Sequence, residues 1–203
     1  MPTYPTFEYE KSYWRSGFEL VAGIDEVGRG SWAGPVVAAA VVLHPKFNLP
    51  GLNDSKKLNA TTREKFAEII QKEALFFGIA QIEVGVINRQ GIGKASFMAM
   101  RSAVKKLKER PHFILVDAFY VPYLIDKKLQ IGIVRGDQLS ISIAAASVVA
   151  KVYRDKLMEK LSKSYPKYGF ERHKGYGTAD HQSAIKKFGF TPIHRTSFNI
   201  TIN

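Results

Sequence analysis

Cysteine is absent from this sequence, which excludes disulfides, thiolate metal sites and cysteine nucleophiles. Long apolar runs are absent too: no window offers about 18 uninterrupted apolar residues, so no membrane-spanning helix is expected. The start, Met1–Thr6, lacks the basic segment followed by an apolar one that marks a secretory signal. We therefore expect a cytoplasmic enzyme or binding protein.

Acidic residues are few beside basic ones, with 18 Asp and Glu against 30 Lys and Arg and a formal net charge of +12. Of this charge, +7 lies between Lys151 and Arg195, where eleven basic residues accompany four acidic ones. A charge run is often only a solvated face, but tyrosines and histidines are interspersed here, and rings among cations suit stacking on sugars or bases beside phosphates. Nucleic acid is the favoured partner. A membrane surface is the weaker alternative, because no segment forms a strongly basic amphipathic helix.

The composition is that of a folded protein. A chain of 203 residues with 45% hydrophobic content can bury one substantial core. The charged fraction of 24% and the aromatic fraction of 12% argue against disorder. We expect a single domain over residues 1–203, with an α/β core over about 18–160 and a basic helical segment over about 161–203.

The hydrophobic pattern predicts strands that alternate with helices. Strands are expected at Val21–Val27, Ala33–Leu43, Phe76–Val84, His112–Val116 and Lys128–Val134. Helices are expected at Phe7–Ser16, Thr61–Leu75, Asn88–Lys108, Ser140–Ser162 and Ala179–Phe188. The first two strands read as a hairpin-like pair, and Thr61–Glu64 resembles a capping box. This order predicts a mixed α/β sheet covered by helices, with the basic tail packed on one edge.

Acidic residues follow three of the predicted strands. Asp25 and Glu26 end the first, Asp117 follows the fourth and Asp137 follows the fifth. Ligand sites of open α/β sheets gather at strand ends, and converging carboxylates cannot all stay ionised without cations. Mg²⁺ and Mn²⁺ take oxygen ligands, and two such ions could clamp the attacking and leaving oxygens of an in-line phosphoryl transfer.

The Asp25–Glu26 doublet is the most specific part of this set. Neighbouring residues of a strand point to opposite faces, so the two acids can share a site only if the strand ends or bulges there, which Gly28 and Gly30 would allow. Other acids are expected to have ordinary roles. Turns or helix caps are assigned to Asp54, Asp126 and Asp180. Asp155 is expected to be an ion-pair partner of a nearby Lys or Arg.

Two other chemistries find no support in the sequence. Serine hydrolysis is disfavoured because no Gly-x-Ser-x-Gly elbow occurs and the histidines lie mainly in the basic tail. A Walker-type phosphate loop is absent: Gly91–Lys94 is glycine-rich but lacks the required spacing, and it reads as the start of a helix.

With these residues in view, the chain resembles bacterial type 2 ribonuclease H, the ribonuclease HII family. The resemblance runs from about Tyr13 to Phe198. It is carried by ordered motifs at Gly23–Gly30 (GIDEVGRG), Gly34–Ala38, Asn53–Leu58 (NDSKKL), Leu115–Asp117, Gly136–Asp137, Ser142–Lys151 (SIAAASVVAK), Arg154–Asp155, His173–Thr178 (HKGYGT) and Thr191–Arg195 (TPIHR). Ala118 departs from the pattern, because the family commonly has glycine after the third acid.

The resemblance implies a ribonuclease H-like fold and endonucleolytic cleavage of RNA in RNA–DNA hybrids or at single ribonucleotides in duplex DNA. It implies a two-ion site for Mg²⁺ or Mn²⁺, with 5′-phosphate and 3′-hydroxyl products. Asp25, Glu26, Asp117 and Asp137 would be the catalytic, metal-binding set. Asp25 would bridge both ions, Glu26 and Asp117 would hold one, and Asp137 the other.

The resemblance also implies substrate contacts. Gly28, Arg29 and Gly30 would approach the 2′-hydroxyl, the group that distinguishes RNA from DNA, and Tyr176 would stack on the next sugar. The further residues assigned to substrate are Lys56 and Lys57, for backbone phosphate, and Arg195. Ser147 and Lys151 suit a DNA contact or helix packing equally well, and His173 and His194 suit phosphate contact or packing. We expect a monomer acting on these duplexes.

Two rival functions are weighed against this one. Type 3 ribonuclease H cuts hybrids but handles single ribonucleotides poorly, and it usually carries an extra N-terminal domain, whereas only about twenty residues precede Val21 here. A catalytically silent nucleic-acid-binding module would use the same basic tail. The four-acid set argues against it, since a pure binder gains nothing from negative charge facing phosphate.

Overall fold

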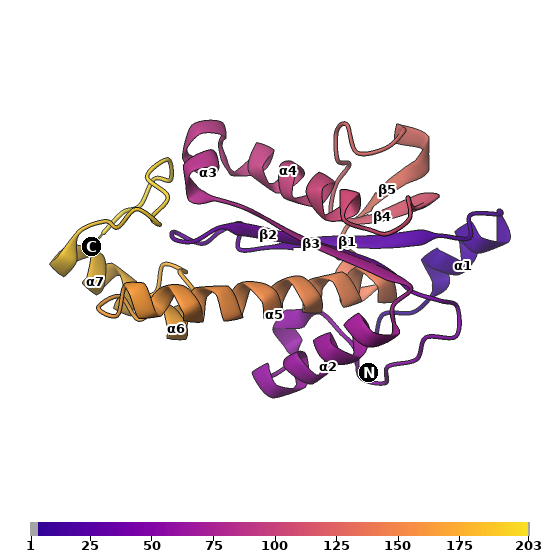
Figure 1. Cartoon of the computed structure of the whole chain (residues 1–203), viewed down its shortest axis with the longest axis horizontal. Helices are drawn as coiled ribbons and strands as arrows, with labels where there is room; N and C mark the ends of the chain where they lie inside the picture. Colours follow the sequence, from indigo (N-terminus) through magenta and orange to yellow (C-terminus); the bar gives the residue numbers. More distant parts are fainter. Residues whose placement is uncertain (1–3, 203) are drawn as a thin grey trace.

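The computed structural model describes residues 4–202 and places a five-stranded sheet between helical layers (Figure 1). Expectations that fall on residues 1–3 and 203 lie outside the described residues. The strands are β1 (Val21–Val27), β2 (Val36–Val42), β3 (Phe76–Ile82), β4 (Phe113–Asp117) and β5 (Gln130–Ile133), in the order β3-β2-β1-β4-β5. The pairs β1–β2 and β2–β3 are antiparallel, while β1–β4 and β4–β5 are parallel.

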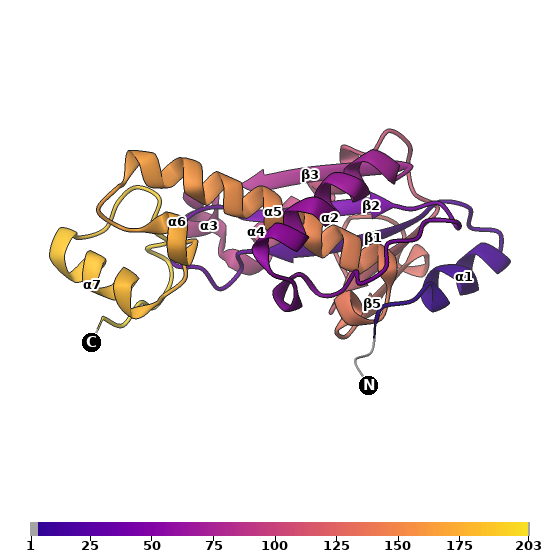
Figure 2. The ribbon, with the colours of Figure 1, turned by 90° about the horizontal axis from the view of Figure 1, so that it is seen from below.

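The two faces of the sheet carry separate apolar cores. The helices are α1 (Glu8–Arg15), α2 (Ala60–Glu73), α3 (Val84–Gln90), α4 (Ile92–Lys105), α5 (Ile141–Ser164), α6 (Phe170–His173) and α7 (Ala179–Phe188). Helix α4 covers one face, and α5 with α2 covers the other (Figures 1 and 2). Alternate residues of β2 enter the two cores. Burial on both faces explains why this strand is a continuous apolar run.

Several element boundaries differ from the prediction. The hairpin-like pair is confirmed, but β2 begins at Val36 rather than Ala33. The single helix expected over Asn88–Lys108 is wrong, because Gly91 takes a positive φ of 79° and separates α3 from α4. That left-handed conformation ends a helix and suits glycine. The predicted helix start at Gly91 is confirmed for α4.

Side-chain caps decide how several helices begin. Asn59, and not the predicted box at Thr61, caps α2 by accepting from the Thr62 N–H at 2.8 Å. Asp54 and Asp126 cap two short 3₁₀ helices, as expected. The expectation for Asp180 is wrong: Thr178 caps α7, and Asp180 lies in the first turn of that helix. Its ion pair with Arg172, at 3.6 Å, explains its place there.

Helix α1 fastens the beginning of α5 through Glu10. The Glu10 carboxylate is fully buried and accepts from the Ser140 hydroxyl at 2.6 Å and from the Ser142 N–H at 2.9 Å. The Thr6 N–H donates to the Leu139 carbonyl at 3.0 Å. A buried acid at a helix N-terminus satisfies free N–H groups and complements the helix dipole. The N-terminal arm therefore holds the turn that carries Asp137.

Replacing Glu10 by alanine is expected to lower the free energy of unfolding by about 2–3 kcal/mol, because it strips charged hydrogen bonds from buried donors. Urea unfolding at pH 7 measures the change. Glu8→Ala is the matched control in the same helix, since the Glu8 side chain is exposed, and it should change stability by less than about 0.5 kcal/mol. Equal losses in the two variants would contradict the anchoring role.

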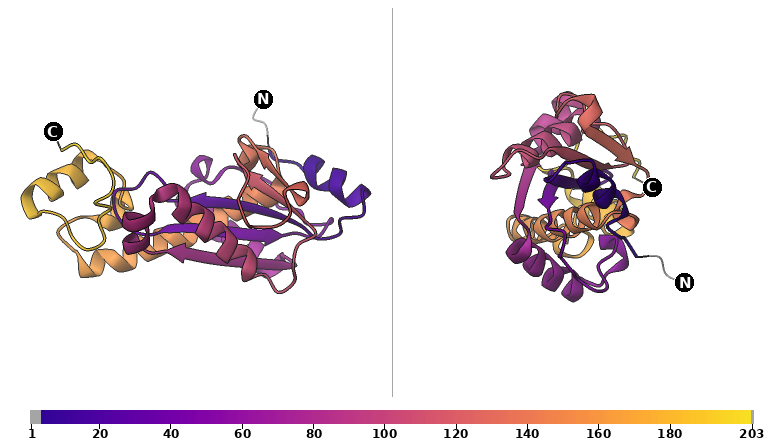
Figure 3. Two further views of the ribbon diagram at one scale, coloured as in Figure 1. Left: turned by 90° about the horizontal axis from the view of Figure 1, so that it is seen from above. Right: turned by 90° about the vertical axis from the view of Figure 1, so that its right-hand side faces the viewer.

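The C-terminal helices lie beyond one end of the sheet, at the end opposite α1 (Figure 3). They pack on a third cluster that includes Ala33, Met158 and Phe170. The Trp32 N–H donates to the Gly175 carbonyl at 2.8 Å and ties this segment to the loop after β1. The basic tail therefore caps the end of the sheet rather than an edge strand. Within residues 4–202 no helix combines the length and apolarity needed to cross a bilayer.

Candidate active site

Three parallel strands deliver acidic side chains to one end of the sheet. In the register of β1, β4 and β5, Ile24 lies beside Val116 and Asp117 lies beside Ile133. Asp137 follows in the short 3₁₀ helix Gly136–Gln138. The Gly136 N–H donates to Asp117 Oδ1 at 2.7 Å. This bond ties Asp117 to the 3₁₀ helix that carries Asp137. The predicted convergence of these strand ends is confirmed.

The Asp25–Glu26 doublet lies within an unbroken strand. The expectation of a strand end or bulge there is wrong, because β1 continues to Val27 in regular pairing with β2. The paired part of β4 instead stops short, and its last partner on β1 is Ile24. Beyond Ile24, the edge of β1 that faces β4 is unpaired. Asp25 and Glu26, which point to opposite faces of the sheet, can therefore both reach the same cavity. Both line a cavity of about 270 Å³ with Val27, Ser55, Lys56, Ser147, Lys151 and Tyr176.

Burial, and then repulsion between the carboxylates, makes ionisation of these acids costly. Burial, followed by the charges of Glu26 and Asp117, raises the pKa of Asp25 well above its usual value. Burial also raises the pKa of Glu26, with Arg29 opposing, and the pKa of Asp117, with hydrogen bonds from the Gly136 and Asp137 N–H groups opposing. The pKa of Asp137 rises to about 6, through burial and then the charges of Asp54 and Asp117. Such mutual shifts are typical of functional sites.

Asp54 is a fifth acid of the cluster that sequence reasoning assigned only to capping. Its side chain is 6% exposed and accepts from the Lys56 N–H at 2.9 Å. It also faces Asp137 closely enough to raise the pKa of that acid. Burial alone would lower the pKa of Lys56, but the charges of Asp54, Asp137, Asp25 and Asp117 raise it. The signal available in the sequence was the position of Asp54, two and three residues before Lys56 and Lys57.

The donor chemistry of this cluster fits divalent cations. The donors are carboxylate oxygens. Burial and then neighbouring acids raise the pKa of Asp25 and of Asp137, and a bound cation would offset both costs of ionisation. Within residues 4–202, no three His, Asp or Glu side chains already form a cage for an ion. Mg²⁺ does not require one, because it usually binds one or two carboxylates and completes its shell with water and substrate phosphates.

The loop over residues 28–35 carries Arg29 beside Glu26, which lines the cavity. Arg29 is 3.5 Å from the Glu26 carboxylate, and its guanidinium lies 4.9 Å from the centre of the Phe119 ring. Gly28 has a φ of 85°, and a Cβ atom there would collide with the Arg154 guanidinium. Gly30 is different, since a Cβ would meet no neighbour within 4 Å. The space above Gly30 is therefore open to a ligand.

Arg195 does not reach the cavity, which corrects its assignment to substrate. Its side chain is fully buried and donates to the Gly34 carbonyl at 2.8 and 3.0 Å and to the Arg29 carbonyl at 3.0 Å. Arg154, equally buried, donates to the carbonyls of Pro35, Ala33 and Lys174. The two arginines hold the loop from beneath. The burial of Arg154 and Arg195 could not be predicted from the sequence, because an arginine normally stays at the surface.

Of the other residues predicted to contact substrate, Tyr176, Ser147 and Lys56 line the cavity and Lys57 does not. Tyr176 is half-buried and lines the cavity, with the Arg154 guanidinium 5.6 Å from its ring centre. The Ser147 hydroxyl lies 2.9 Å from the Ser55 hydroxyl. It also donates to Asp25, which lowers the pKa of that acid, so Ser147 supports the acid from α5. Lys56 lines the cavity, whereas Lys57 is exposed outside its lining.

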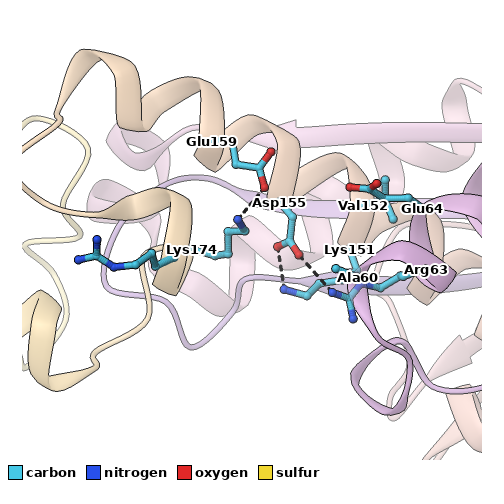
Figure 4. Close-up of a pocket in the computed structure, with 9 residues that line it drawn as sticks. Ala60, Arg63, Glu64, Lys151, Val152, Asp155, Glu159 and Lys174 are labelled. Atoms are coloured by element: carbon cyan, nitrogen blue, oxygen red, sulfur yellow. Dashed lines mark hydrogen bonds and ion pairs between the residues drawn. The ribbon is translucent and has the colours of Figure 1, made fainter.

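A second pocket, of about 300 Å³, adjoins the first and shares Lys151 with it (Figure 4). Asp155 is paired there with Lys151 at 2.7 Å and with Arg63 at 3.7 Å, which confirms its predicted ion-pair role. Lys174 is 2.7 Å from Glu159 and ties the segment before Tyr176 to α5. These pairs occupy three of the four cations that line the pocket, and the fourth, Arg172, is paired with Glu171 and Asp180.

Ala118, at the position where the resemblance leads us to expect glycine, takes a backbone conformation that suits glycine. Its φ is 67°, in the left-handed region where a side chain costs about 1 kcal/mol. The turn directs Phe119 under Arg29.

Solved ribonuclease structures share this architecture. The ribonuclease H2 of Pyrococcus horikoshii superposes with a TM-score of 0.72 at 26% identity, over 89% of this chain and 94% of that chain. A structure of Bst-RNase HIII in complex with Mn²⁺ gives a TM-score of 0.70 at 21% identity, over 89% and 67% of the two chains, and shares the fold. The mixed sheet between helices, with acids at its parallel strand ends, defines a ribonuclease H-like hydrolase.

Sequence comparison places the chain more closely. The family model for Ribonuclease HII matches residues 22–201. The Ribonuclease HII of Desulfitobacterium hafniense is 52% identical over 189 residues, which cover 93% of this chain and 72% of that protein. The chain belongs to the ribonuclease HII family. The resemblance, the fold class and the enzyme class predicted from the sequence are confirmed.

Proposed function

We propose that this enzyme hydrolyses the RNA strand of RNA–DNA hybrids and incises duplex DNA at single ribonucleotides, leaving 5′-phosphate and 3′-hydroxyl ends. The observation that carries the proposal is one cavity that joins the Asp25–Glu26 pair to Lys56 and Tyr176. Acids alone would repel a phosphodiester. Acids that bind cations, beside a lysine and an aromatic ring, suit a nucleic-acid backbone.

Asp25, Glu26, Asp117 and Asp137 would hold two Mg²⁺ or Mn²⁺ ions. When bound, such ions supply charge neutralisation at the phosphate and a water of lowered pKa. The chain's own groups bind and orient the substrate. Lys56 attracts phosphate. Hydrolysis forms a bond from a water oxygen to phosphorus as the bond to the 3′ oxygen breaks, and that oxygen leaves as the 3′-hydroxyl.

Recognition of RNA is assigned to the loop with Gly28, Arg29 and Gly30. The free space at Gly30 lets the backbone approach a sugar edge closely, where a 2′-hydroxyl is the distinguishing group. Arg29 is held between Glu26 and Phe119 and needs little ordering when it binds. Tyr176 would stack on the following sugar. Because the site reads sugar and shape, we expect little base preference. The enzyme is proposed to act as a monomer.

A cleavage assay with three labelled duplexes tests the proposal: one RNA–DNA hybrid, one DNA duplex with a single ribonucleotide, and the matched all-DNA duplex. With Mg²⁺ or Mn²⁺ we expect cutting of the first two and none of the third. At the lone site the cut falls on the 5′ side, so the ribonucleotide keeps the 5′-phosphate. A polymerase that extends the upstream fragment verifies its 3′-hydroxyl.

Each departure from this result has a distinct meaning. Cutting of the hybrid alone would favour the type 3 activity. Binding without cutting would favour a silent binding module. Cleavage that persists in excess chelator would contradict the metal site. A strong dependence on the identity of the ribonucleotide base would contradict recognition by sugar and shape.

A further inference from the structure

Three histidine rings lie side by side next to the Tyr176 segment. The rings of His173 and His181 are 4.5 Å apart at an interplanar angle of 14°, and those of His181 and His194 are 5.2 Å apart. His181 is 0% exposed and His194 is 1% exposed. Neither lines the catalytic cavity. Of the two roles left open for His194, phosphate contact and packing, the structure supports packing. His181 and His194 can therefore influence the catalytic cavity only through the residues that they contact.

Backbone partners determine where the protons of two of these rings lie. The Thr191 N–H donates to His194 Nδ1 at 2.8 Å, so the proton of neutral His194 is on Nε2. His181 Nδ1 is 2.9 Å from the Tyr176 carbonyl, which can only accept, so the proton of His181 is on Nδ1. The two Nε2 atoms are 3.0 Å apart, with His194 donating and His181 accepting. The bonds form one directed chain from Thr191 to Tyr176.

His173 fastens the other side of Tyr176. Its Nδ1 accepts from the Gly175 N–H at 3.2 Å, and its Nε2 donates to the Tyr168 carbonyl at 2.7 Å. The Tyr176 N–H donates to the His173 carbonyl at 2.9 Å. The peptide groups on both sides of Tyr176 are thus bonded to the histidine cluster.

The chain of bonds requires neutral rings. A second proton on His194 would set an N–H against the Thr191 N–H, and one on His181 would set two N–H groups against each other. Burial is the main cause that lowers the pKa of both rings to about 4. Both are therefore neutral at pH 7.

We propose that His194 and His181 are positioning residues that hold the Tyr176 carbonyl, and with it the ring, in place for substrate. Tyr176 lies between Gly175 and Gly177, the residue type with the greatest backbone freedom. Its carbonyl accepts from the Thr178 N–H at 2.8 Å as well as from His181, and the His181 bond adds to this hold. Ordering a mobile side chain on binding costs entropy, and a side chain that is already ordered avoids this cost when substrate binds. The inference rests on the substrate contact proposed for Tyr176.

Two substitutions at His181 separate the hydrogen bond from the volume of the ring. His181→Phe keeps a ring but removes the donor, and it should raise KM for the single-ribonucleotide duplex about 5–20-fold with kcat changed less than about threefold. His181→Asn restores an N–H near the position of Nδ1 and should recover most of the loss. His44→Phe is the control, because His44 lies outside the cluster and packs on Phe47. Unchanged KM in His181→Phe would overturn the proposal.

A double-mutant cycle with Tyr176→Ala tests whether the effect passes through the tyrosine. We expect Tyr176→Ala to raise KM and His181→Phe to add nothing in that background. Independent, additive increases would overturn the positioning role and leave the substrate contact standing. Unchanged KM in Tyr176→Ala would overturn the contact and the positioning role together. Metal-dependent cleavage is measured in every variant and reports separately on the proposed activity.

The imidazole ¹⁵N resonances of the wild-type protein give a test that needs no variant. At pH 7 we expect neutral rings of opposite tautomer, with the proton on Nε2 of His194 and on Nδ1 of His181. The same tautomer at both rings, or an imidazolium at either, would overturn the proposal even if the His181 variants fail to fold.

Discussion

Asp25→Asn is expected to lower the cleavage rate by on the order of a thousandfold or more, because it removes the carboxylate proposed to bridge two cations. Binding of an RNA–DNA hybrid should be largely retained, since the contacts assigned to Arg29, Lys56 and Tyr176 remain. Single-turnover cleavage and a binding titration measure the two effects separately. Near-normal cleavage would contradict the two-ion site.

The same substitution should stabilise the metal-free protein. The pKa of Asp25 is raised in the folded state, by burial and then by Glu26 and Asp117. Ionised Asp25 therefore opposes folding at pH 7, and asparagine removes that cost. The gain in Tm should vanish below the unfolded pKa of about 4, where the carboxyl is protonated in both states. Mg²⁺ should raise the Tm of the wild type more than that of the variant.

Asp126→Asn is the matched control for charge. Asp126 is an exposed residue that caps a 3₁₀ helix by accepting from the Lys128 N–H at 2.9 Å. Asparagine can keep this cap while one negative charge is lost. Cleavage, hybrid binding and the response of the Tm to Mg²⁺ should all match the wild type. An equal loss of cleavage here would show that the Asp25 effect is one of net charge.

Gly23→Ala is expected to have the largest effect on stability, a loss of about 3–5 kcal/mol or failure to fold. A Cβ atom at Gly23 would collide with the backbone of Ser142 and Ile143 in α5. Backbone atoms cannot move out of the way as a side chain can, so β1 and α5 would have to move apart. Asp25 lies on the same face of β1, two residues after Gly23. Its hydrogen bond with Ser147 of α5 requires the close native spacing of β1 and α5.

Gly93→Ala gives the comparison for this glycine. Gly93 lies in the first turn of α4, and a Cβ there would meet nothing within 4 Å. The free energy of unfolding of the Gly93→Ala variant should equal that of the wild type or exceed it by up to about 1 kcal/mol, because alanine suits a helix better than glycine. Urea unfolding of both variants measures the difference. Similar losses at the two positions would contradict the close contact of β1 with α5.

Local patterns predicted much of this molecule. The sequence placed α7 at residues 179–188 and β1 at residues 21–27, where the structure has them. It also placed acids after three strands that prove to be parallel neighbours. Such features follow from the periods of helices and strands and from turn chemistry, which are properties of short segments.

Other predictions were wrong or incomplete. The single helix over residues 88–108 was expected because its apolar spacing is continuous, yet Gly91 breaks it. Arg195 was assigned to substrate, and its carbonyl partners at Gly34 and Arg29 lie far away in the sequence. Asp54 was assigned to a cap, and it serves as one while also facing Asp137.

The amino-acid sequence by itself determined the alternation of strands and helices, the excess of positive charge and the family, because these depend on short patterns and on ordered motifs. Only the tertiary structure decided which arginines are buried, that Asp54 joins the acids, and that a chain of neutral histidines ends at the Tyr176 carbonyl. Burial, pKa shifts and hydrogen-bond direction depend on distances between segments far apart in the chain, and folding sets those distances.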